Sequence, residues 1–224
     1  MKPELLVGVV DSGHAPQQTV LVHAARGFRL TPEALLEGPA AEDRLGHGTA
    51  VLEALALQPG AIRCCVAQVF AERWQTSPLQ VAAAVHWLVE QGVALINLSL
   101  GLRHDRPLLR DACERALAAG VVLCAASPAQ GAAVYPASYP EVLRISGDAR
   151  CAPGQWSWLG SAQADFGAPV SAGGLAGASL ACATLSGQIA RYLHAHPGCD
   201  HAALLEHLRG GAAFVGSERR GRPA

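Results

Sequence analysis

The sequence predicts one α/β domain in which a mostly parallel central sheet carries helices on both faces. Two observations lead to this fold class. Apolar, β-branched runs alternate with helical patterns along the chain, and this order builds parallel strands joined by right-handed crossovers. The chain has 224 residues, of which 50% are hydrophobic and 16% charged, enough for one substantial core and too few for two. The predicted domain spans residues 1–215, and residues 216–224 are predicted to form a flexible tail because they hold three arginines and no apolar anchor.

Five apolar runs are predicted to be the strands of this sheet, because buried parallel strands are apolar on both faces. They are residues 5–10, 62–70, 93–100, 121–126 and 141–146. Two clear helices are predicted at 78–92, where apolar residues recur at helical spacing, and at 107–120. Residues 25–45 and 147–165 are rich in Gly, Pro and charge, so we expect surface connections there.

Composition and charge exclude several classes of protein. The formal net charge of −1 lacks the basic field of a nucleic-acid binder. The polar turn at Ser12-Gly13 follows only six apolar or small residues, too few for a signal peptide, so a cytoplasmic location is expected. The uncharged segment 166–190 is rich in small residues and contains Pro169, which argues against a membrane span. Seven cysteines without CxxC spacing are expected to be reduced, mostly buried thiols.

Three polar residues stand where chemistry is common in α/β folds. Asp11 follows the first strand, His47 lies between two glycines before an apolar helical run, and Ser179 opens a helix of small residues. Each alone has a structural alternative: a turn-capping Asp, a helix-entry His and an N-cap Ser. Together they supply the carboxylate, base and nucleophile of acyl transfer, in the order Asp, His, Ser.

The segments around these residues resemble the motifs of the subtilisin-like serine proteases. The Asp, His and Ser motifs are similar to VVDSG (9–13), GHGTAV (46–51) and GASLACA (177–183). Four further segments also resemble parts of the family. Residues 93–101 resemble its substrate-binding strand, and residues 121–127 resemble the strand before its oxyanion-hole loop. Residues 135–146 resemble the next strand, and residues 165–170 resemble the segment before the serine. The resemblance covers roughly residues 5–197 and implies a subtilisin-like three-layer fold.

The resemblance also implies a role for each matching residue. Asp11 would orient His47, His47 would take the proton of Ser179, and Ser179 would attack a peptide carbonyl and offer its backbone N–H to the oxyanion. The backbone of Ser99-Leu100-Gly101 would bind an extended peptide as an added strand. The implied activity is that of a serine endopeptidase, and no cofactor or metal is implied.

The oxyanion loop departs from the family pattern. Family members usually place an Asn side chain in the oxyanion hole, whereas here the matching position is Pro128, which can donate nothing. Losing one such donor costs about 10²–10³ in turnover. A substitute is therefore expected from Gln130 or Ser127, with Gln130 favoured for its amide, or else the enzyme is slow.

The pocket for the residue before the cut is expected to be small. In the family its walls correspond to Ser99-Leu100-Gly101 and to Ala125-Ala126-Ser127, with glycine common at the position of Ser127 and at the floor. Here Ser127 adds a hydroxymethyl group and Val134 replaces the floor glycine. Ala, Gly or Ser is expected before the scissile bond, because a rigid pocket cannot take in extra volume without strain.

The expected substrate is a partner peptide. The first strand starts almost at Met1, so no prodomain is expected, and no acidic loop suggests a calcium site. This combination resembles small subtilases of peptide maturation, in particular the one associated with leader removal from the crosslinked γ subunit of quinohemoprotein amine dehydrogenase. Expected partners are an extended peptide or precursor protein and other maturation enzymes, with no nucleic acid and no membrane.

Two other functions compete with that of a protease. Pro128 leaves open a pseudoprotease that binds and escorts a peptide, although a pure binder needs none of the three triad residues. An α/β hydrolase acting on esters or small amides expects GxSxG and the order Ser, Asp, His, and both are absent from the sequence.

Overall fold

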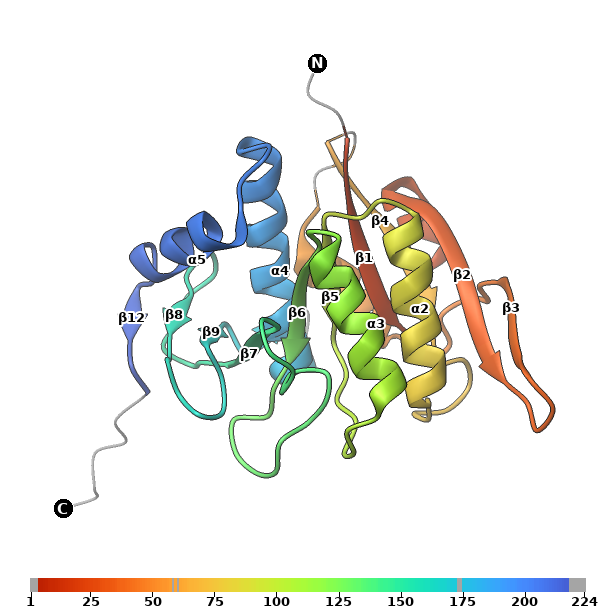
Figure 1. The fold of residues 1–224 in the computed structure, drawn as a ribbon. Helices are drawn as coiled ribbons and strands as arrows, with labels where there is room; N and C mark the ends of the chain where they lie inside the picture. The colour runs from red at the N-terminus through yellow and green to blue at the C-terminus, as the bar shows by residue number, and fades with distance from the viewer. Residues whose placement is uncertain (1–3, 58, 60, 173–174, 218–224) are drawn as a thin grey trace.

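A ten-stranded sheet runs through the computed structural model, which describes residues 4–57, 59, 61–172 and 175–217 (Figure 1). In spatial order the strands are β12 (Phe214–Val215), β8 (Ser157–Trp158), β9 (Phe166–Ala168), β7 (Leu143–Gly147), β6 (Val122–Ala126), β5 (Leu95–Leu98), β1 (Leu5–Asp11), β4 (Ile62–Gln68), β2 (Val22–Leu30) and β3 (Leu35–Pro39). Neighbouring strands are parallel except for the pairs β2–β3 and β8–β9. A separate antiparallel pair, β10 (Ser171–Ala172) and β11 (Leu175–Ala176), precedes the helix that carries Ser179.

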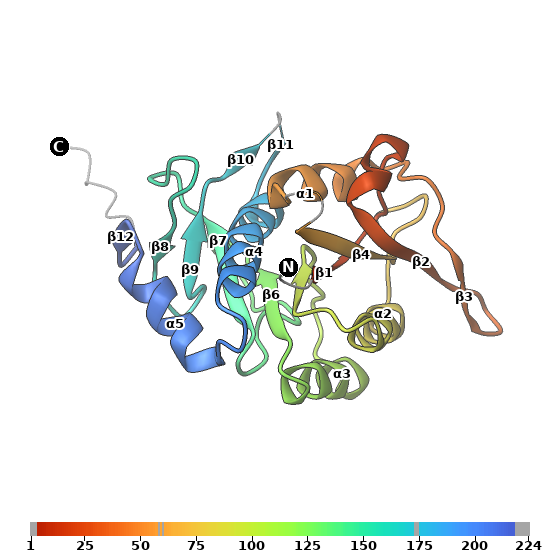
Figure 2. The same cartoon turned by 90° about the horizontal axis from the view of Figure 1, so that it is seen from above.

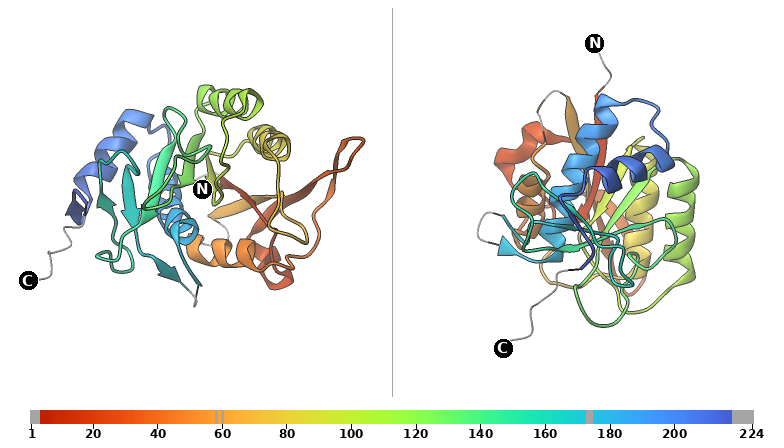
Figure 3. Two further views of the ribbon diagram at one scale, coloured as in Figure 1. Left: turned by 90° about the horizontal axis from the view of Figure 1, so that it is seen from below. Right: turned by 90° about the vertical axis from the view of Figure 1, so that its left-hand side faces the viewer.

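Helices cover both faces of the sheet (Figure 2). On one face lie α1 (His47–Leu55) and α4 (Ala178–Ala195), and on the other lie α2 (Pro78–Glu90) and α3 (Pro107–Ala118). A fifth helix, α5 (His201–Gly210), lies beside α4 toward the β12 end of the sheet (Figure 3). This arrangement confirms the predicted three-layer α/β fold with a mostly parallel sheet.

The strand β1 shows why the central strands could be predicted from the sequence. Val7 and Val9 point into the core beneath α1 and α4, whereas Val10 belongs to the core beneath α2 and α3. Both faces are buried, so the run is apolar at every position rather than at alternate ones. Gly8 lies where α2 presses on the strand, since a Cβ there would stand 2.9 Å from a methyl group of Leu88. The five predicted strands and both predicted helices are present within a few residues of the expected bounds.

The prediction of surface connections at 25–45 and 147–165 is wrong in part. The first range holds most of β2 and all of β3, which form a hairpin projecting from the body of the molecule (Figure 1), and the second holds the short strand β8. The short 3₁₀ helix η1 (Pro16–Leu21) leads into β2. Because β2 and β3 lie at the sheet edge, they keep charged side chains and show no clear apolar pattern. The strand conformation of β2 depends instead on its pairing with β4, which is distant in the sequence.

The helix α5 also escaped prediction. Its N-cap is Asp200, whose side chain accepts a hydrogen bond from the backbone N–H of Ala203 at 2.8 Å. Leu204 and Leu208 are its buried positions. A helix of ten residues with only two buried leucines gives a weak periodic signal, because its outer face is polar.

The cysteine prediction is confirmed. All seven cysteines are free thiols, six are buried and Cys199 is partly buried. Burial raises the pKa of Cys64, Cys113 and Cys124 to about 12, so these thiols are neutral. Of the predicted tail, residues 218–224 lie outside the described residues, while the N–H of Gly216 donates to the carbonyl of Trp158 at 2.8 Å. In the part of the chain that the structure describes, no helix has the length and apolar character needed to cross a membrane.

Candidate active site

Asp11 is the last residue of β1 and is fully buried. Its carboxylate accepts a hydrogen bond from the backbone N–H of Ser12 at 2.7 Å and from Nδ1 of His47 at 2.8 Å to Oδ1 and 3.0 Å to Oδ2. The parallel sheet delivers this carboxylate at its carboxyl edge, where α/β folds place their ligand sites. A charge buried this deeply is stabilised only through such partners.

His47 is the first residue of α1, and two glycines place it there. Gly46 has a φ of +74°, a backbone conformation that side chains disfavour. At Gly48 a Cβ would stand 2.2 Å from the carbonyl oxygen of Gly13, so any side chain would push α1 off the turn after β1. The N–H of Gly48 also donates to Oγ of Ser12 at 2.9 Å. The helix therefore begins directly on the β1 turn, which brings the imidazole ring to Asp11.

Asp43 is a site residue that the sequence reasoning missed. It accepts hydrogen bonds from the N–H of Gly46 at 2.9 Å, the N–H of Thr49 at 2.8 Å and the hydroxyl of Thr49 at 2.7 Å. Burial acts to raise the pKa of Asp43, but the hydrogen bonds from Thr49, Ser12 and Gly46 outweigh it and lower the pKa. Asp43 thus clamps the turn on both sides of His47. The available signal was an Asp shortly before a helix start, a capping pattern.

The environment of His47 favours its protonated form. The hydrogen bond to Asp11 raises the pKa of His47, burial acts against this, and the charges of Asp11 and Asp43 add to the rise. Because Nδ1 is held by the carboxylate, Nε2 is the nitrogen left for proton transfer. A histidine of this kind can accept a proton and hold the resulting charge.

Ser179 is the second residue of α4 and is held against the end of β5. Its hydroxyl donates to the carbonyl of Ser99 at 3.0 Å, and the hydroxyl of Ser99 donates to the carbonyl of Ser179 at 2.9 Å. Behind them the fully buried Asn97 donates to Oγ of Ser99 at 2.9 Å and accepts from the hydroxyl of Ser186 at 3.1 Å. Asn97 and Ser186 were also missed, although a polar residue inside the apolar run 93–100 was a visible signal. The network fixes the start of α4 beside Ser99.

His47 and Ser179 line one cleft of about 390 Å³. One wall is the backbone segment 99–102, which includes the predicted substrate-binding residues Ser99, Leu100 and Gly101. The other wall is formed by Phe70, Trp74, Gln75 and Thr76. The ring of Trp74 is 63% exposed and meets the imidazole of His47 edge-on, with 5.4 Å between ring centroids. The structure thus brings Asp11, His47, Ser179 and the segment 99–101 together.

Of the predicted oxyanion donors, Ser179 lines the cleft, whereas Gln130 and the alternative donor Ser127 do not. Gln130 is exposed and lines another cavity of about 510 Å³, together with Ser146 and Val170. Ser127 is buried, its hydroxyl donates to the carbonyl of Gln163 at 2.7 Å and its N–H donates to the carbonyl of Ile145 at 2.8 Å. The hydroxyl of Ser127 is therefore engaged away from the cleft, and the role of Gln130 stays a prediction.

Val134 lies against the segment that is expected to bind substrate. A Cβ built on Gly101 would stand 3.0 Å from Cβ of Val134, so the valine side chain occupies the space beside this glycine. Two hydrogen bonds between Leu102 and Tyr135, of 2.7 and 2.9 Å, hold the two segments in register. Ala125 and Ala126, the other predicted wall residues, are buried at the end of β6.

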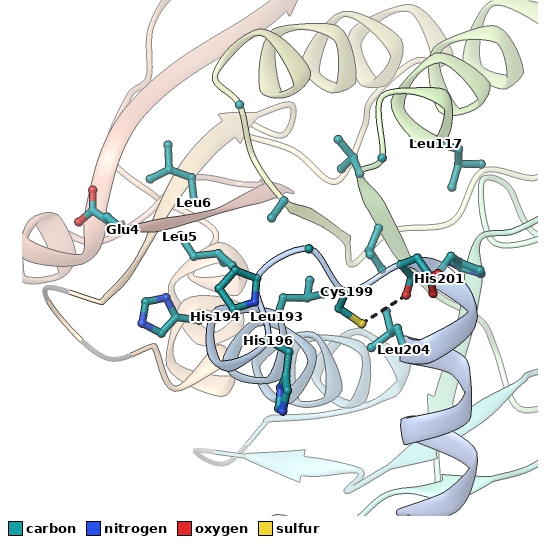
Figure 4. A pocket seen from close by; sticks show the side chains of 18 of the residues that line it. Glu4, Leu5, Leu6, Leu117, Leu193, His194, His196, Cys199, His201 and Leu204 are labelled. Atoms are coloured by element: carbon teal, nitrogen blue, oxygen red, sulfur yellow. Dashed lines mark hydrogen bonds between the residues drawn. The ribbon is translucent and has the colours of Figure 1, made fainter. Parts of the chain in front are cut away.

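A further cavity of about 490 Å³ lies at the opposite, amino-terminal edge of the sheet (Figure 4). Leu5 and Leu6 at the start of β1, Leu117 near the end of α3, and Leu193 and Leu204 around the α4–α5 connection line it. None of the predicted site residues lines this cavity. It is separate from the cleft at the carboxyl ends of the strands.

Comparison with known proteins relates the chain to the subtilisins. No family model matches the chain. Subtilisin BL of Lederbergia lenta is 26% identical over 233 residues, covering 94% of this chain and 84% of the relative, and Subtilisin Savinase of the same organism gives the same values. The halolysin-like extracellular serine protease Nep of Natrialba magadii is 32% identical over 149 residues, covering 61% of this chain and 27% of that protein. The chain is a serine endopeptidase similar to the subtilisins.

Solved structures of other proteases share the fold of this chain. The S41 psychrophilic protease superposes with a TM-score of 0.71 at 18% identity, covering 93% of this chain and 83% of that one. The prenylagaramide maturation protease PagA gives 0.62 at 22% identity, with 85% and 76% covered. A mutant of the protease domain of PatA gives 0.63 at 21% identity, with 85% and 79% covered.

Proposed function

We propose that this subtilisin-like protease uses Asp11, His47 and Ser179 as its catalytic triad and removes a leader segment from a precursor peptide. The observation that carries the triad is the hydrogen bond from His47 Nδ1 to the buried carboxylate of Asp11, together with the presence of His47 and Ser179 in the same cleft. The raised pKa of His47 has the direction expected of a base that must hold a proton during the reaction.

The proposed reaction begins with a turn of the Ser179 hydroxyl. In the free enzyme this hydroxyl donates to Ser99, so rotation about the Cα–Cβ bond brings it to Nε2 of His47, and catalytic hydrogen bonds often form only once substrate is bound. Oγ attacks the peptide carbonyl while His47 takes the proton. His47 then gives this proton to the leaving amine, and water repeats the sequence on the acyl-enzyme to release the acid. Asp11 stabilises the imidazolium throughout.

The oxyanion site is proposed to rest on the start of α4. The backbone N–H of Ser179 and the positive end of the helix dipole face the developing charge. Pro128 adds no donor, so Gln130 is proposed to supply the second hydrogen bond after moving from the cavity that it lines in the free enzyme. Until that movement occurs the site is incomplete, which suits slow, dedicated processing.

A precursor peptide is the proposed substrate. PagA is described as a maturation protease, and its fold matches this chain. The backbone of Ser99–Gly101 lies along the cleft, where an extended leader segment can add as a strand. The γ subunit of quinohemoprotein amine dehydrogenase is the proposed precursor, with other maturation enzymes as partners in the cytoplasm. Pro128 and the position of Gln130 favour one alternative, a weak or inactive pseudoprotease that escorts the peptide.

The experiment that tests this function incubates purified protein with the candidate precursor and weighs the products by mass spectrometry. We expect a single cut that separates leader from core, made by the wild type and not by Ser179→Ala. A precursor that binds but stays intact at high enzyme concentration would favour the escort function. A cut made equally by Ser179→Ala would exclude the triad.

A further inference from the structure

A second cavity continues the active-site cleft on the side away from Ser179. This distal groove, of about 580 Å³, lies between the β2–β3 hairpin and the start of α2. Gln75 and Thr76 line both the cleft and the distal groove, so the two adjoin each other at this segment. A peptide that lies along the segment 99–102 and passes Trp74 therefore enters the distal groove next.

The distal groove carries positive charge without a partner. Arg29 and Arg73 both line it and are exposed, and neither forms an ion pair with any residue in the described ranges. The acidic lining residue, Glu72, is already paired with Arg44 at 3.2 Å. Arg26 on the same hairpin has Glu37 as its partner at 3.1 Å, whereas Arg29 lies opposite a leucine, Leu36. Two guanidinium groups are thus left to bind an anion from outside the chain.

The walls of the distal groove are tied together in the free enzyme. Gln80 on α2 is buried, and its Nε2 donates to the carbonyl of Phe28 on β2 at 2.8 Å and to the carbonyl of Val69 at 3.4 Å. Ser77 caps the start of α2, whose positive dipole end adds to the field of the arginines. Oγ1 of Thr76 is buried and has no hydrogen-bond partner among the described residues.

We propose that the distal groove binds an acidic stretch of the substrate that lies upstream of the cut, and that this stretch selects the precursor. The inference rests on the proposed function, because the segment 99–101 is there the binding strand for residues before the cut. Arginine pairs carboxylates through charge-assisted, often bidentate hydrogen bonds. Because the distal groove lies beyond the cleft and an extended chain advances only ~3.3 Å per residue, the acidic side chain belongs several residues before the scissile bond, and about four to eight residues upstream is the interval to scan.

Paired peptides test the groove. Each pair shares the residues around the cut and differs only in Glu or Gln at one upstream position, scanned over this interval. We expect kcat/KM about fivefold higher for the best Glu peptide, mainly through KM, because exposed ion pairs of this kind contribute little more. The preference should shrink as salt rises, since both arginines are exposed. In the double variant Arg29→Gln/Arg73→Gln the preference should vanish while the Gln peptide is cut as before.

Arg115→Gln is the matched control, because Arg115 is an exposed arginine on α3 that lines neither cavity. It should keep the full preference for Glu. Equal cleavage of both peptides by the wild type, or a preference that survives in the double variant, overturns the proposal. If neither peptide is cut, the proposed function fails separately, and binding of fluorescent peptides to Ser179→Ala still decides the groove: tighter binding of the Glu peptide supports it and equal binding rejects it.

Discussion

His47 is the proposed catalytic base, so its ionisation is expected to set the pH dependence of the rate. Its pKa is raised above 6.5 by the hydrogen bond to Asp11, against the effect of burial. Since only the neutral ring can accept a proton, kcat/KM should rise with pH through a midpoint above 6.5. The sign for stability is opposite: protonated His47 stabilises the fold below pH 6.5, and this contribution is lost as pH rises through the raised pKa.

NMR titration of the imidazole measures this pKa directly. In Asp11→Asn the midpoint should fall, because the largest cause of the rise is removed, and turnover should drop by about 10⁴-fold. Circular dichroism checks that the variant is folded. A His47 midpoint that is the same with and without the carboxylate would contradict the electrostatic account.

Val134 is predicted to limit the size of the side chain that is accepted before the cut. Its side chain occupies the space beside Gly101, so Val134→Gly should open the pocket and Val134→Ala should open it partly. The ratio of kcat/KM for a peptide with Phe before the cut to one with Ala should rise about tenfold or more in Val134→Gly. A wild type that cuts after Phe as fast as after Ala would show that the pocket is not filled.

The proposed oxyanion role of Gln130 is tested by measuring whether its replacement changes kcat, KM or both. If its amide reaches the oxyanion only in the transition state, Gln130→Ala should lower kcat by about 10²-fold with little change in KM. Ala129→Ser, a change at the neighbouring exposed residue, serves as the control. An unchanged kcat would leave the Ser179 N–H as the donor.

At the scale of elements, the start of α1 depends on the Asp43 clamp. The carboxylate of Asp43 accepts three hydrogen bonds from Gly46 and Thr49, on either side of His47. Asp43→Asn should lower the free energy of unfolding by about 1–3 kcal/mol, because the amide nitrogen of Asn cannot accept the hydrogen bonds that one carboxylate oxygen accepts. Urea unfolding at neutral pH measures this loss.

The same substitution has a predicted pH signature. A lowered pKa means that ionised Asp43 stabilises the fold above its ordinary value of 3.8 and that this contribution is lost as pH falls through the lowered pKa. The stabilities of wild type and Asp43→Asn should therefore converge in strong acid. A gap of constant size from neutral pH down to strong acid would show that the clamp acts without its charge.

At the scale of the whole molecule, the central sheet could be predicted because both its faces are buried. In β1, for example, Val7 and Val10 pack into the hydrophobic cores on opposite faces of the sheet. The β2–β3 hairpin could not be predicted from the sequence, because β2 pairs with β4, about forty residues away in the chain, and keeps arginines at the sheet edge. A sequence pattern predicts a strand or helix only where burial selects the same kind of residue at regular spacing along the chain.

The site divides in the same way. Asp11, His47 and Ser179 stand at strand and helix ends, where short glycine-containing motifs mark them in the sequence. Asn97 and Ser186 act on Ser99 and hence on Ser179 from positions far apart in sequence, so only the folded chain shows their connection. The distal groove likewise joins β2 to the loop after β4, and no motif spans both.

The proposed mechanism requires that Asp11 and His47 activate the hydroxyl of Ser179. Fluorophosphonate labelling followed by mass spectrometry of peptides tests this activation, because the reagent reacts only with an activated serine. One adduct is expected on the peptide containing Ser179 in the wild type, none there in Ser179→Ala, and strongly slowed labelling in His47→Ala. A folded wild type that stays unlabelled, or a label that forms as fast in His47→Ala, would rule this mechanism out.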